Sequence, residues 1–454
     1  MASRSTAIVV LIVSVAAFTA PDSARADSIH KQIQKHVPEI ASYLKGKGVK
    51  TVGVLKFRVK KPGEKTTDSA GSINSLLADR LEVAMILGNS FNESQQLQII
   101  KNASDQVAKV EGANHLSEAG RRAMFGARYQ LAWGDTSAKA DAFLTGVVAV
   151  HDDGKNASIG ILCFHRSGGK LERACSLFEA ELDASTLGEM GESFVLRGAF
   201  DGGNSRLSFK NKQQKRENQI REQVVEVRNK AVDFPLVDSN APVSLEVLYD
   251  GKPVKIETRN GRAFVPEPVT GQKVQFALLR NQAARGRLGI VLKVNGENTL
   301  HRETNRDLDC TKWILGPQDK RIVIGGYQMD GETAQPFEVL SQSESARRAI
   351  NYGRNVGLIQ LTVFEELTGP PPTTDVVDED EEDLLAMLRG TQPSETPGSL
   401  SALKRQIRLA GKTELNRGLI ANDESKRTES KVTQVRYTAN PTPIMSATIT
   451  YYSR

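Results

Sequence analysis

The pattern of apolar residues changes at Pro242, and this change sets the domain organisation of the 454-residue chain. Before it, runs with helical spacing alternate with runs of β-forming residues, in the order α-β-α-β-α-β-β-β-α. Residues 33–44 begin this series with apolar side chains at helical spacing, and Thr186–Phe200 ends it as an expected amphipathic helix. The alternation predicts an α/β sandwich with a mixed sheet over residues 27–203.

After Pro242 the chain consists of short apolar runs separated by turn pairs, among them Asp250-Gly251, Asn260-Gly261 and Asn295-Gly296. The expected strands are Ser244–Tyr249, Lys255–Thr258, Val274–Leu279, Leu288–Val294, Arg321–Tyr327, Phe337–Leu340 and Gly357–Phe364. Strands of this length and spacing predict an all-β sandwich, with a barrel as the alternative, over residues 241–368. The chain is therefore expected to be an α+β multidomain protein.

Two charged segments and a short terminal unit complete the expected organisation. Residues 204–240 are polar and basic and favour a solvent-exposed helical spacer. Residues 369–399 are acidic and rich in proline, which predicts a disordered linker. Within residues 400–454, two strand patterns at 431–437 and 446–452 predict a β-hairpin, which should dock on another domain or on a partner because two strands alone are marginally stable.

The first 26 residues predict export. One arginine precedes the apolar run Ala7–Ala20, and Ala24-Arg25-Ala26 supplies small residues before a cut at Asp27. The run is shorter than the roughly 20 apolar residues that cross a bilayer, although a retained N-terminal anchor stays the alternative. The residue directly after the cut is Asp27 and not a cysteine, so we expect a periplasmic or secreted protein that is not lipidated and has no membrane span in its mature part.

Charge and motifs exclude several classes of function. The chain has 60 basic and 54 acidic residues, an excess too weak and too dispersed to predict a nucleic-acid partner. The best metal candidate is His151-Asp152-Asp153 near His165, but it lacks further ligands and a polar turn is the preferred interpretation. Because no nucleophile elbow or phosphate-binding loop is present, we expect no catalytic residue, metal or cofactor.

The three cysteines allow one disulfide, and the sequence does not decide whether it forms. Cys163 and Cys175 flank an expected hairpin turn and could face each other as a disulfide, provided that the strand register allows it. Cys310 is then expected to be a buried apolar residue.

Two features of the expected β-sandwich are candidates for ligand binding. Asn295 and Asn298 lie in a turn at a strand end, and Trp313 and Tyr327 supply amphipathic aromatic rings. Polar loop groups beside aromatic rings suit a sugar or peptide surface. The alternative is that Asn295 only forms a hairpin turn and Trp313 only anchors the core.

Three segments carry a resemblance to a known domain. Lys50–Val59 (KTVGVLKFRV), Leu76–Glu82 (LLADRLE) and Ala140–Gly146 (ADAFLTG) resemble the periplasmic α/β domain found in curli-secretion and flagellar outer-membrane lipoproteins and in activators of penicillin-binding proteins. The resemblance covers roughly residues 31–200 and implies a role in the cell envelope. Because this chain lacks the lipidated cysteine, the resemblance does not imply an outer-membrane anchor.

The whole chain resembles exported proteins of planctomycete-type bacteria. The segments that carry this likeness are Val291–Leu300, Cys310–Leu315, Gly326–Gln328, Asn351–Gly353 and Met445–Tyr452. It implies export and a shared architecture, and it implies no catalytic role.

Together these features favour a non-enzymatic periplasmic or cell-envelope protein that acts as a binding or scaffolding module. The expected partners are an envelope protein or polymer, and the basic and acidic segments could also join copies of the chain head to tail. An exported hydrolase with a site between the two main domains is the alternative function, and a stalk or matrix component without a ligand is the third.

Overall fold

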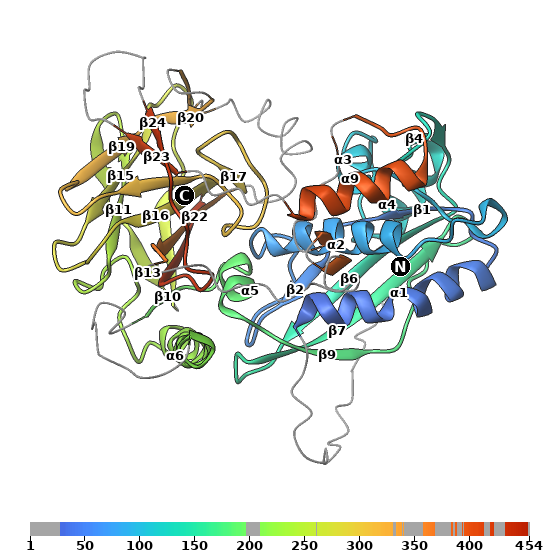
Figure 1. Cartoon of the computed structure of the whole chain (residues 1–454), viewed down its shortest axis with the longest axis horizontal. Coiled ribbons are helices and arrows are strands. Elements are labelled where there is room, and N and C mark those ends of the chain that lie inside the picture. Colours follow the sequence, from blue (N-terminus) through green and yellow to red (C-terminus); the bar gives the residue numbers. More distant parts are fainter. Residues whose placement is uncertain are drawn as a thin grey trace, which may run out of the picture.

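The computed structural model shows a mixed α+β protein with an α/β domain and a β-rich domain side by side (Figure 1). It describes residues 28–196, 209–259, 261–329, 333–337, 339, 357–367, 383–384, 386–387, 393, 395–412, 418–421 and 432–452. The predicted signal segment, and most of the predicted acidic linker, lie outside these residues. Within them, no helix combines the length and the apolar character needed to cross a membrane.

The N-terminal domain is built on a seven-stranded mixed sheet with the order β3-β1-β6-β7-β8, in which β2 also pairs with β6 and β9 with β7. Its strands are β1 (Thr51–Val54), β2 (Arg58–Lys60), β3 (Gln98–Ile99), β6 (Ala142–Val150), β7 (Asn156–His165), β8 (Glu172–Arg173) and β9 (Phe178–Glu181). The first three strands pair in parallel and the last three antiparallel, so the predicted mixed sheet is confirmed.

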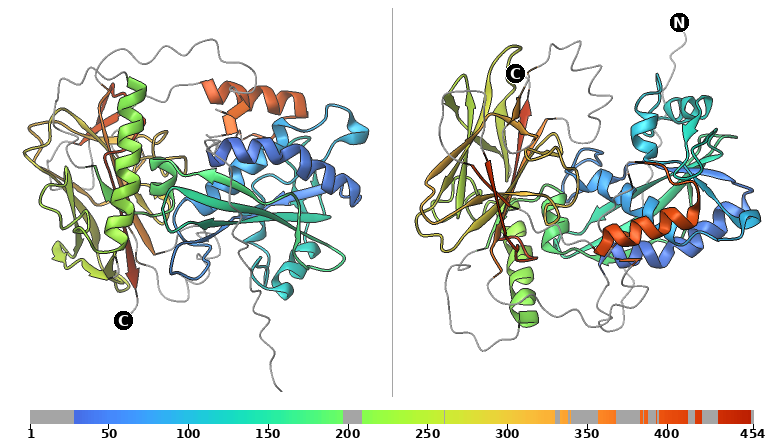
Figure 2. Two further views of the ribbon diagram at one scale, coloured as in Figure 1. Left: turned by 90° about the horizontal axis from the view of Figure 1, so that it is seen from below. Right: turned by 45° about the horizontal axis from the view of Figure 1, so that its top comes forward.

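Helices cover both faces of this sheet (Figure 2). The two long helices α1 (Ile29–Gly46) and α2 (Ile73–Leu87) contribute to the main hydrophobic core, and α1 does so through a stripe at helical spacing. The opposite face carries α3 (Ala103–Val107) and α4 (Glu118–Ala123) over a smaller aromatic cluster. The remaining short elements are η1 (Glu93–Gln95), η2 (Met124–Gly126), β4 (Tyr129–Gln130) and β5 (Ser137–Ala138).

The helix predicted for Thr186–Phe200 is wrong after Glu189 within the described residues, and residues 197–200 lie outside them. The helix α5 spans only Ala184–Glu189, and a short strand, β10 (Phe194–Val195), follows it. Gly191, at φ 73°, stands between them, and a Cβ there would lie 2.4 Å from the backbone oxygen of Ala70. The chain therefore turns out of the helix here at a position that only glycine fits.

The second domain contains two large sheets that share one core. A four-stranded sheet has the order β12-β11-β15-β19, and a ten-stranded sheet has the order β13-β14-β25-β22-β16-β18-β23-β24 with β10 on β25 and β17 on β16. The strands of the first sheet are β11 (Val243–Tyr249), β12 (Lys252–Val254), β15 (Val274–Arg280) and β19 (Arg321–Ile324). Besides β10, those of the second are β13 (Glu257–Arg259), β14 (Arg262–Pro266), β16 (Leu288–Val294), β17 (Glu297–Asn298), β18 (Lys312–Leu315), β22 (Leu358–Glu365), β23 (Gly418–Ala421), β24 (Val432–Val435) and β25 (Met445–Tyr452). A separate pair joins β20 (Gly326–Gln328) to β21 (Ala334–Pro336).

Two of the predicted turn pairs form tight hairpins. Asp250-Gly251 joins β11 to β12, and Asn295-Gly296 joins β16 to β17. Both residues of each pair have positive φ, as a two-residue hairpin with this turn requires.

The predicted C-terminal hairpin does not form. The strand β24 pairs with β23, whereas β25 lies inside the large sheet between β22 and β14. The expectation that this segment docks on another domain is confirmed, because β25 also pairs with β10. Upstream of these strands, the helix α9 (Leu400–Lys412) returns to the N-terminal domain, where the Lys404 ammonium donates to the backbone oxygen of Asn89 at 2.7 Å.

The basic spacer is a helix, as predicted, but one side of it is buried, so it is only partly solvent-exposed. This helix, α6 (Phe209–Arg228), runs along the junction of the two domains (Figure 2). Ile220, Val224 and Val227 are buried at a spacing that gives one narrow apolar stripe. Tertiary packing against α5 and β10 therefore makes this segment part of the structure.

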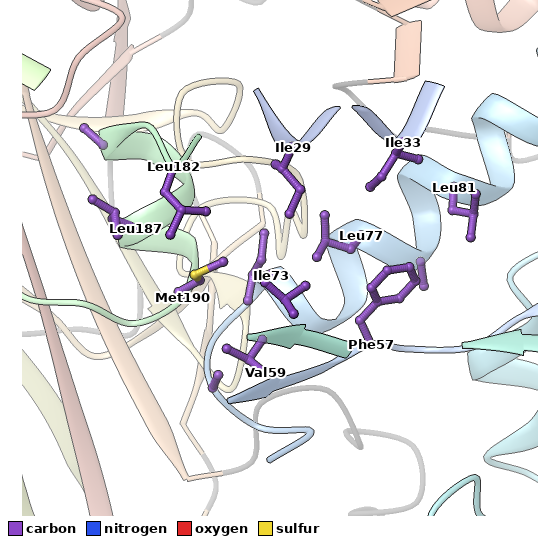
Figure 3. Close-up of a cluster of buried hydrophobic side chains, with 14 of the residues drawn as sticks. Ile29, Ile33, Phe57, Val59, Ile73, Leu77, Leu81, Leu182, Leu187 and Met190 are labelled. Atoms are coloured by element: carbon purple, nitrogen blue, oxygen red, sulfur yellow. The ribbon is translucent and has the colours of Figure 1, made fainter. Parts of the chain in front are cut away.

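One hydrophobic cluster runs through both domains. At the junction, α1 and α2 pack against the segment that contains α5 (Figure 3). The labelled side chains in this contact include Ile29, Ile73, Leu77, Leu187 and Met190. Because burial of apolar area stabilises folded proteins, this shared core holds the two domains together.

Candidate functional site

The four residues predicted as a ligand surface serve the structure of the β-rich domain. The side-chain oxygen of Asn295 accepts hydrogen bonds from the Gly357 amide at 2.9 Å and from the Tyr451 hydroxyl at 2.8 Å. Asn298 is fully buried and donates to the Glu303 carboxylate at 2.9 Å. Both asparagines therefore tie loops to the sheet.

The two aromatic residues are also held within the domain. The Trp313 side chain is 2% exposed, and its indole donates to the Thr299 hydroxyl at 2.9 Å. Tyr327 is half-buried under the guanidinium of Arg302, which lies 5.1 Å from the ring centre. These contacts agree with the alternative interpretation, in which Asn295 forms a hairpin turn and Trp313 anchors the core.

The histidines considered as a metal site lie far apart. His165 pairs with Ala142 at one end of the β6–β7 ladder, whereas His151 follows Val150 at the other end. His151 bonds to the Ser158 hydroxyl at 2.8 Å, and His165 bonds to the Tyr43 hydroxyl at 3.0 Å. Among the residues that the structure describes, no three potential ligands are grouped around a metal position.

The predicted disulfide is not formed in the structure. The register of β7 places Cys163 opposite Glu172, so Cys175 is not its cross-strand neighbour. All three cysteines are free and buried. Burial raises the pKa of the Cys163 thiol to about 12 and that of Cys175 to about 11, which makes both poor nucleophiles.

A cleft at the junction of the domains is a stronger candidate site. It consists of two adjoining hollows of about 460 and about 580 Å³. We call it the interdomain cleft. Its lining comes from the loop after β2 (61–65, 67, 69 and 70), the turn before β10 (191–193), the end of α6 (227–228), the β13–β14 hairpin (259, 261, 262 and 264), and β22 and β25 (358, 448 and 450). Both domains and the helix between them therefore contribute to it.

Cations converge on one carboxylate in this cleft. The Lys61 ammonium lies 3.3 Å from the Glu192 carboxylate, and the Arg228 guanidinium lies 3.2 Å from the same oxygen atom. Burial lowers the pKa of Lys61, the nearby Glu192 opposes this, and the charges of Arg262 and Arg228 lower it further. Lys61 is therefore a largely buried ammonium with two guanidinium groups close by.

The cleft lining also contains a second ion pair. Arg262 of β14 pairs with Glu64 of the loop after β2, so this contact also spans the two domains. Next to Arg262, a Cβ on Gly261 would lie 2.7 Å from the backbone oxygen of Val227. The hairpin thus packs directly against the end of α6, which brings Arg262 and Arg228 to the same cleft.

Of the hydroxyl-bearing residues in the cleft lining, Ser193 and Thr448 are direct neighbours. The Ser193 hydroxyl accepts a hydrogen bond from the Thr448 amide at 3.2 Å. The Thr448 hydroxyl is buried and has no hydrogen-bond partner among the described residues. An unpaired buried hydroxyl costs about 1–3 kcal/mol, so the fold retains a polar group here at the expense of stability.

A different buried ion pair lies beside the cleft. The Arg80 guanidinium of α2 donates two bonds to the Glu189 carboxylate of α5, at 2.9 and 3.0 Å. Both side chains are fully buried, and the His30 ring lies 3.4 Å from the same guanidinium. Burial and the charge of Arg80 hold the pKa of His30 well below its usual range, so His30 stays neutral.

Comparison with known proteins finds no matching family model and no matching curated protein. Among solved structures, the chain is similar to the C-terminal domain of LpoB from Salmonella enterica, with a TM-score of 0.21 and 9% identity over 32% of this chain and 93% of that chain. A likeness with this TM-score supports no conclusion about fold or function. The resemblances described from sequence therefore stay predictions.

The sequence suggested a site between the two main domains, in the hydrolase alternative, but it did not identify the residues of the cleft, because the cations of the cleft come from distant segments. Each of them stands in a short basic stretch of the sequence, Arg58–Lys61, Arg228–Lys230 or Arg259–Arg262. These stretches were a weak signal, since only the fold brings them together.

Proposed function

We propose that this chain is an exported, non-enzymatic binding and scaffolding protein of the cell envelope, and that it holds its ligand in the interdomain cleft. The observation that supports this most directly is the cleft itself, where both domains place charged groups around one open volume. Ligand sites commonly lie at such domain junctions.

The way in which the domains are joined supports the scaffolding part of the proposal. The strand β10 extends the sheet of the second domain, and α9 returns from the second domain to α2. The helix α6 contacts both sides, because Arg221 pairs with Glu181 at 2.7 Å and Arg216 pairs with Glu365 at 2.7 Å. A site built on elements that are fixed in this way is pre-organised for binding.

Hydrolysis in the same cleft is the second candidate function. One observation favours it: the pKa of Lys61 is lowered by burial, and Ser193 lies in the same lining. A lysine with a lowered pKa can serve as a general base for a serine nucleophile. Against this, the Lys61 ammonium contacts Glu192, and this contact favours its charged form.

The decisive experiment combines binding and turnover measurements on the chain from Asp27 onward. We expect the protein to sediment with isolated bacterial cell-envelope material and to show no turnover on ester, amide, glycoside and phosphoester substrates. Turnover that is abolished in Ser193→Ala, with Ser176→Ala as a matched serine control outside the cleft, would support the hydrolase instead. Absence of both sedimentation and turnover would favour a stalk without a ligand.

A further inference from the structure

We infer that the interdomain cleft binds an oxyanion, a phosphate or carboxylate group carried by an envelope polymer, through Lys61, Arg228 and Arg262. This inference rests on the proposed function and names the chemistry of its ligand. Three independent features of the cleft carry it: its charge, the burial of its central ammonium and its unpaired hydroxyl.

The described cleft has more cations than carboxylates. The cationic lining residues are Lys61, Lys65, Arg228, Arg259 and Arg262, and the carboxylates in contact with them are Glu64, Glu192 and Glu257. Like charges in one cleft repel each other, and the repulsion strengthens where protein walls replace water. An arriving anion would relieve this repulsion, so the arrangement favours anionic ligands over neutral ones.

The geometry at Glu192 leaves Lys61 incompletely compensated. One oxygen atom of this carboxylate serves both Lys61 and Arg228, at 3.3 and 3.2 Å, which is long for charge-assisted contacts. Lys61 is only 8% exposed, so few water molecules can replace the missing partner. A second oxyanion in the cleft would supply the acceptor that the buried ammonium needs.

Thr448 adds a hydroxyl donor that the fold does not use. Its buried side-chain oxygen has no partner among the described residues and belongs to the same lining as Lys61. Valine has nearly the same shape and lacks the hydroxyl group. We therefore assign the Thr448 hydroxyl as a donor to the ligand.

The kind of cation favours an oxyanion in particular. A guanidinium presents a planar fork of N–H groups that matches the geometry of phosphate and carboxylate. Arg228 and Arg262 come from elements in direct contact, so both forks are held in place before the ligand arrives. Recognition of one or two oxyanions in a polymer needs no other chemistry in this cleft.

The test is calorimetric titration of the chain from Asp27 onward with inorganic phosphate and with glucuronate, at low ionic strength. We expect Arg262→Gln to weaken binding at least tenfold and Thr448→Val to weaken it severalfold without lowering the unfolding midpoint. Arg321→Gln is the matched control, because Arg321 is 44% exposed in a surface ion pair away from the cleft and Arg262 is 48% exposed. This control should change the affinity by less than twofold.

The outcomes separate this inference from the proposed function. Equal weakening by Arg262→Gln and Arg321→Gln, or no binding of either probe, would overturn the oxyanion inference. Sedimentation with envelope material that neither phosphate nor glucuronate displaces would leave the proposed function intact and overturn only the inference. Displacement by phosphate or by glucuronate would support the inference and identify a phosphate-rich or a carboxylate-rich polymer as the source.

Discussion

The segment that crosses between the domains carries two glutamates, Glu189 and Glu192. Their ion pairs with cationic side chains differ in geometry and in burial. Among the described residues Glu189 pairs closely with Arg80, which offers it two bonds of about 3 Å in a site that excludes solvent. Glu192 shares one oxygen atom between Lys61 and Arg228 at the wall of an open cleft. The first site is closed and charge-balanced, and the second is open and has excess positive charge.

The contrast between Glu189 and Glu192 shows how one turn of chain can serve both stability and binding. Gly191 separates the two glutamates and reverses the chain direction, so one side chain points into α2 and the other toward the cleft. A balanced buried pair is sensitive to loss of one partner, because the other charge is then stranded. Mutation of a site with excess charge at a cleft should instead change the affinity for the ligand.

Loss of the buried Arg80–Glu189 pair should have the largest effect on the free energy of unfolding. Arg80→Met leaves the Glu189 carboxylate buried without its cation, and we expect a loss of about 3–5 kcal/mol in the free energy of unfolding. Urea unfolding followed by circular dichroism measures this loss. Arg122→Met, at an exposed arginine of α4, is the control and should cost less than about 0.5 kcal/mol.

A double variant refines this prediction. Arg80→Met with Glu189→Met removes both charges, and it should recover most of the lost stability because apolar side chains can replace a buried ion pair. If the single variant costs less than about 1 kcal/mol, the pair is not the closed site that its geometry indicates.

The second effect tests a buried carboxyl group whose described contacts are neutral donors. Glu217 of α6 accepts bonds from the Ala184 amide at 2.7 Å and from the Thr442 hydroxyl at 3.2 Å. Burial and the charge of Asp183 raise its pKa to about 7, compared with about 4.3 in an unfolded chain. The folded state therefore binds this proton more tightly, and its contribution to stability is lost as the pH rises from about 4 to above 7.

Glu217→Gln removes that pH dependence. We expect the variant to be more stable than the parent by roughly 2 kcal/mol at pH 8 and equally stable near pH 4. Urea unfolding midpoints at pH 4, 6 and 8 measure the difference. Glu222→Gln, at an exposed position of the same helix, is the control and should show no such trend. A difference that grows toward low pH would contradict the direction of the pKa shift.

The third effect belongs to the open cleft. Glu192→Gln removes a carboxylate that competes with the ligand for Lys61 and Arg228, so phosphate affinity should rise. One unit charge at about 4 Å in water contributes about 1 kcal/mol, which corresponds to roughly a fivefold gain. Calorimetric titration at low ionic strength measures it. Unchanged or weaker phosphate binding would show that Glu192 does not oppose an anion in this cleft.

The sequence was informative where structure is local. The pair Asn295-Gly296 predicted its hairpin because both positions need positive φ, and α1 was visible from one apolar stripe. Long-range pairing was not visible: β25 was recognised as a strand, but its neighbours β10 and β14 lie far away in the sequence. Tertiary packing also overrode the polar appearance of α6, whose buried stripe is only a few residues wide.

The candidate site was predictable only in its general place, as a site between the two main domains. Asn298 and Trp313 have the chemistry of ligand-binding residues, but the fold uses the amide nitrogen of Asn298 and the indole of Trp313 for its own hydrogen bonds. Lys61, Arg228 and Arg262 stand in three separate segments that each look like ordinary solvated surface. Convergence of this kind depends on topology and has no periodic signature in the sequence.

The last prediction concerns the stability of the protein without Arg262. It tests whether Arg262 acts as a ligand-binding cation of the open cleft or as a structural ion-pair partner like Arg80. Half-exposed ion pairs contribute at most about 1 kcal/mol, and loss of Arg262 would also relieve repulsion on Lys61. Arg262→Gln should therefore change the free energy of unfolding by less than about 1 kcal/mol, as should the control Arg321→Gln. Urea unfolding in the absence of phosphate measures both. A loss above about 2 kcal/mol would make Arg262 a structural ion-pair partner like Arg80, and weaker anion binding by that variant would then reflect damage to the cleft.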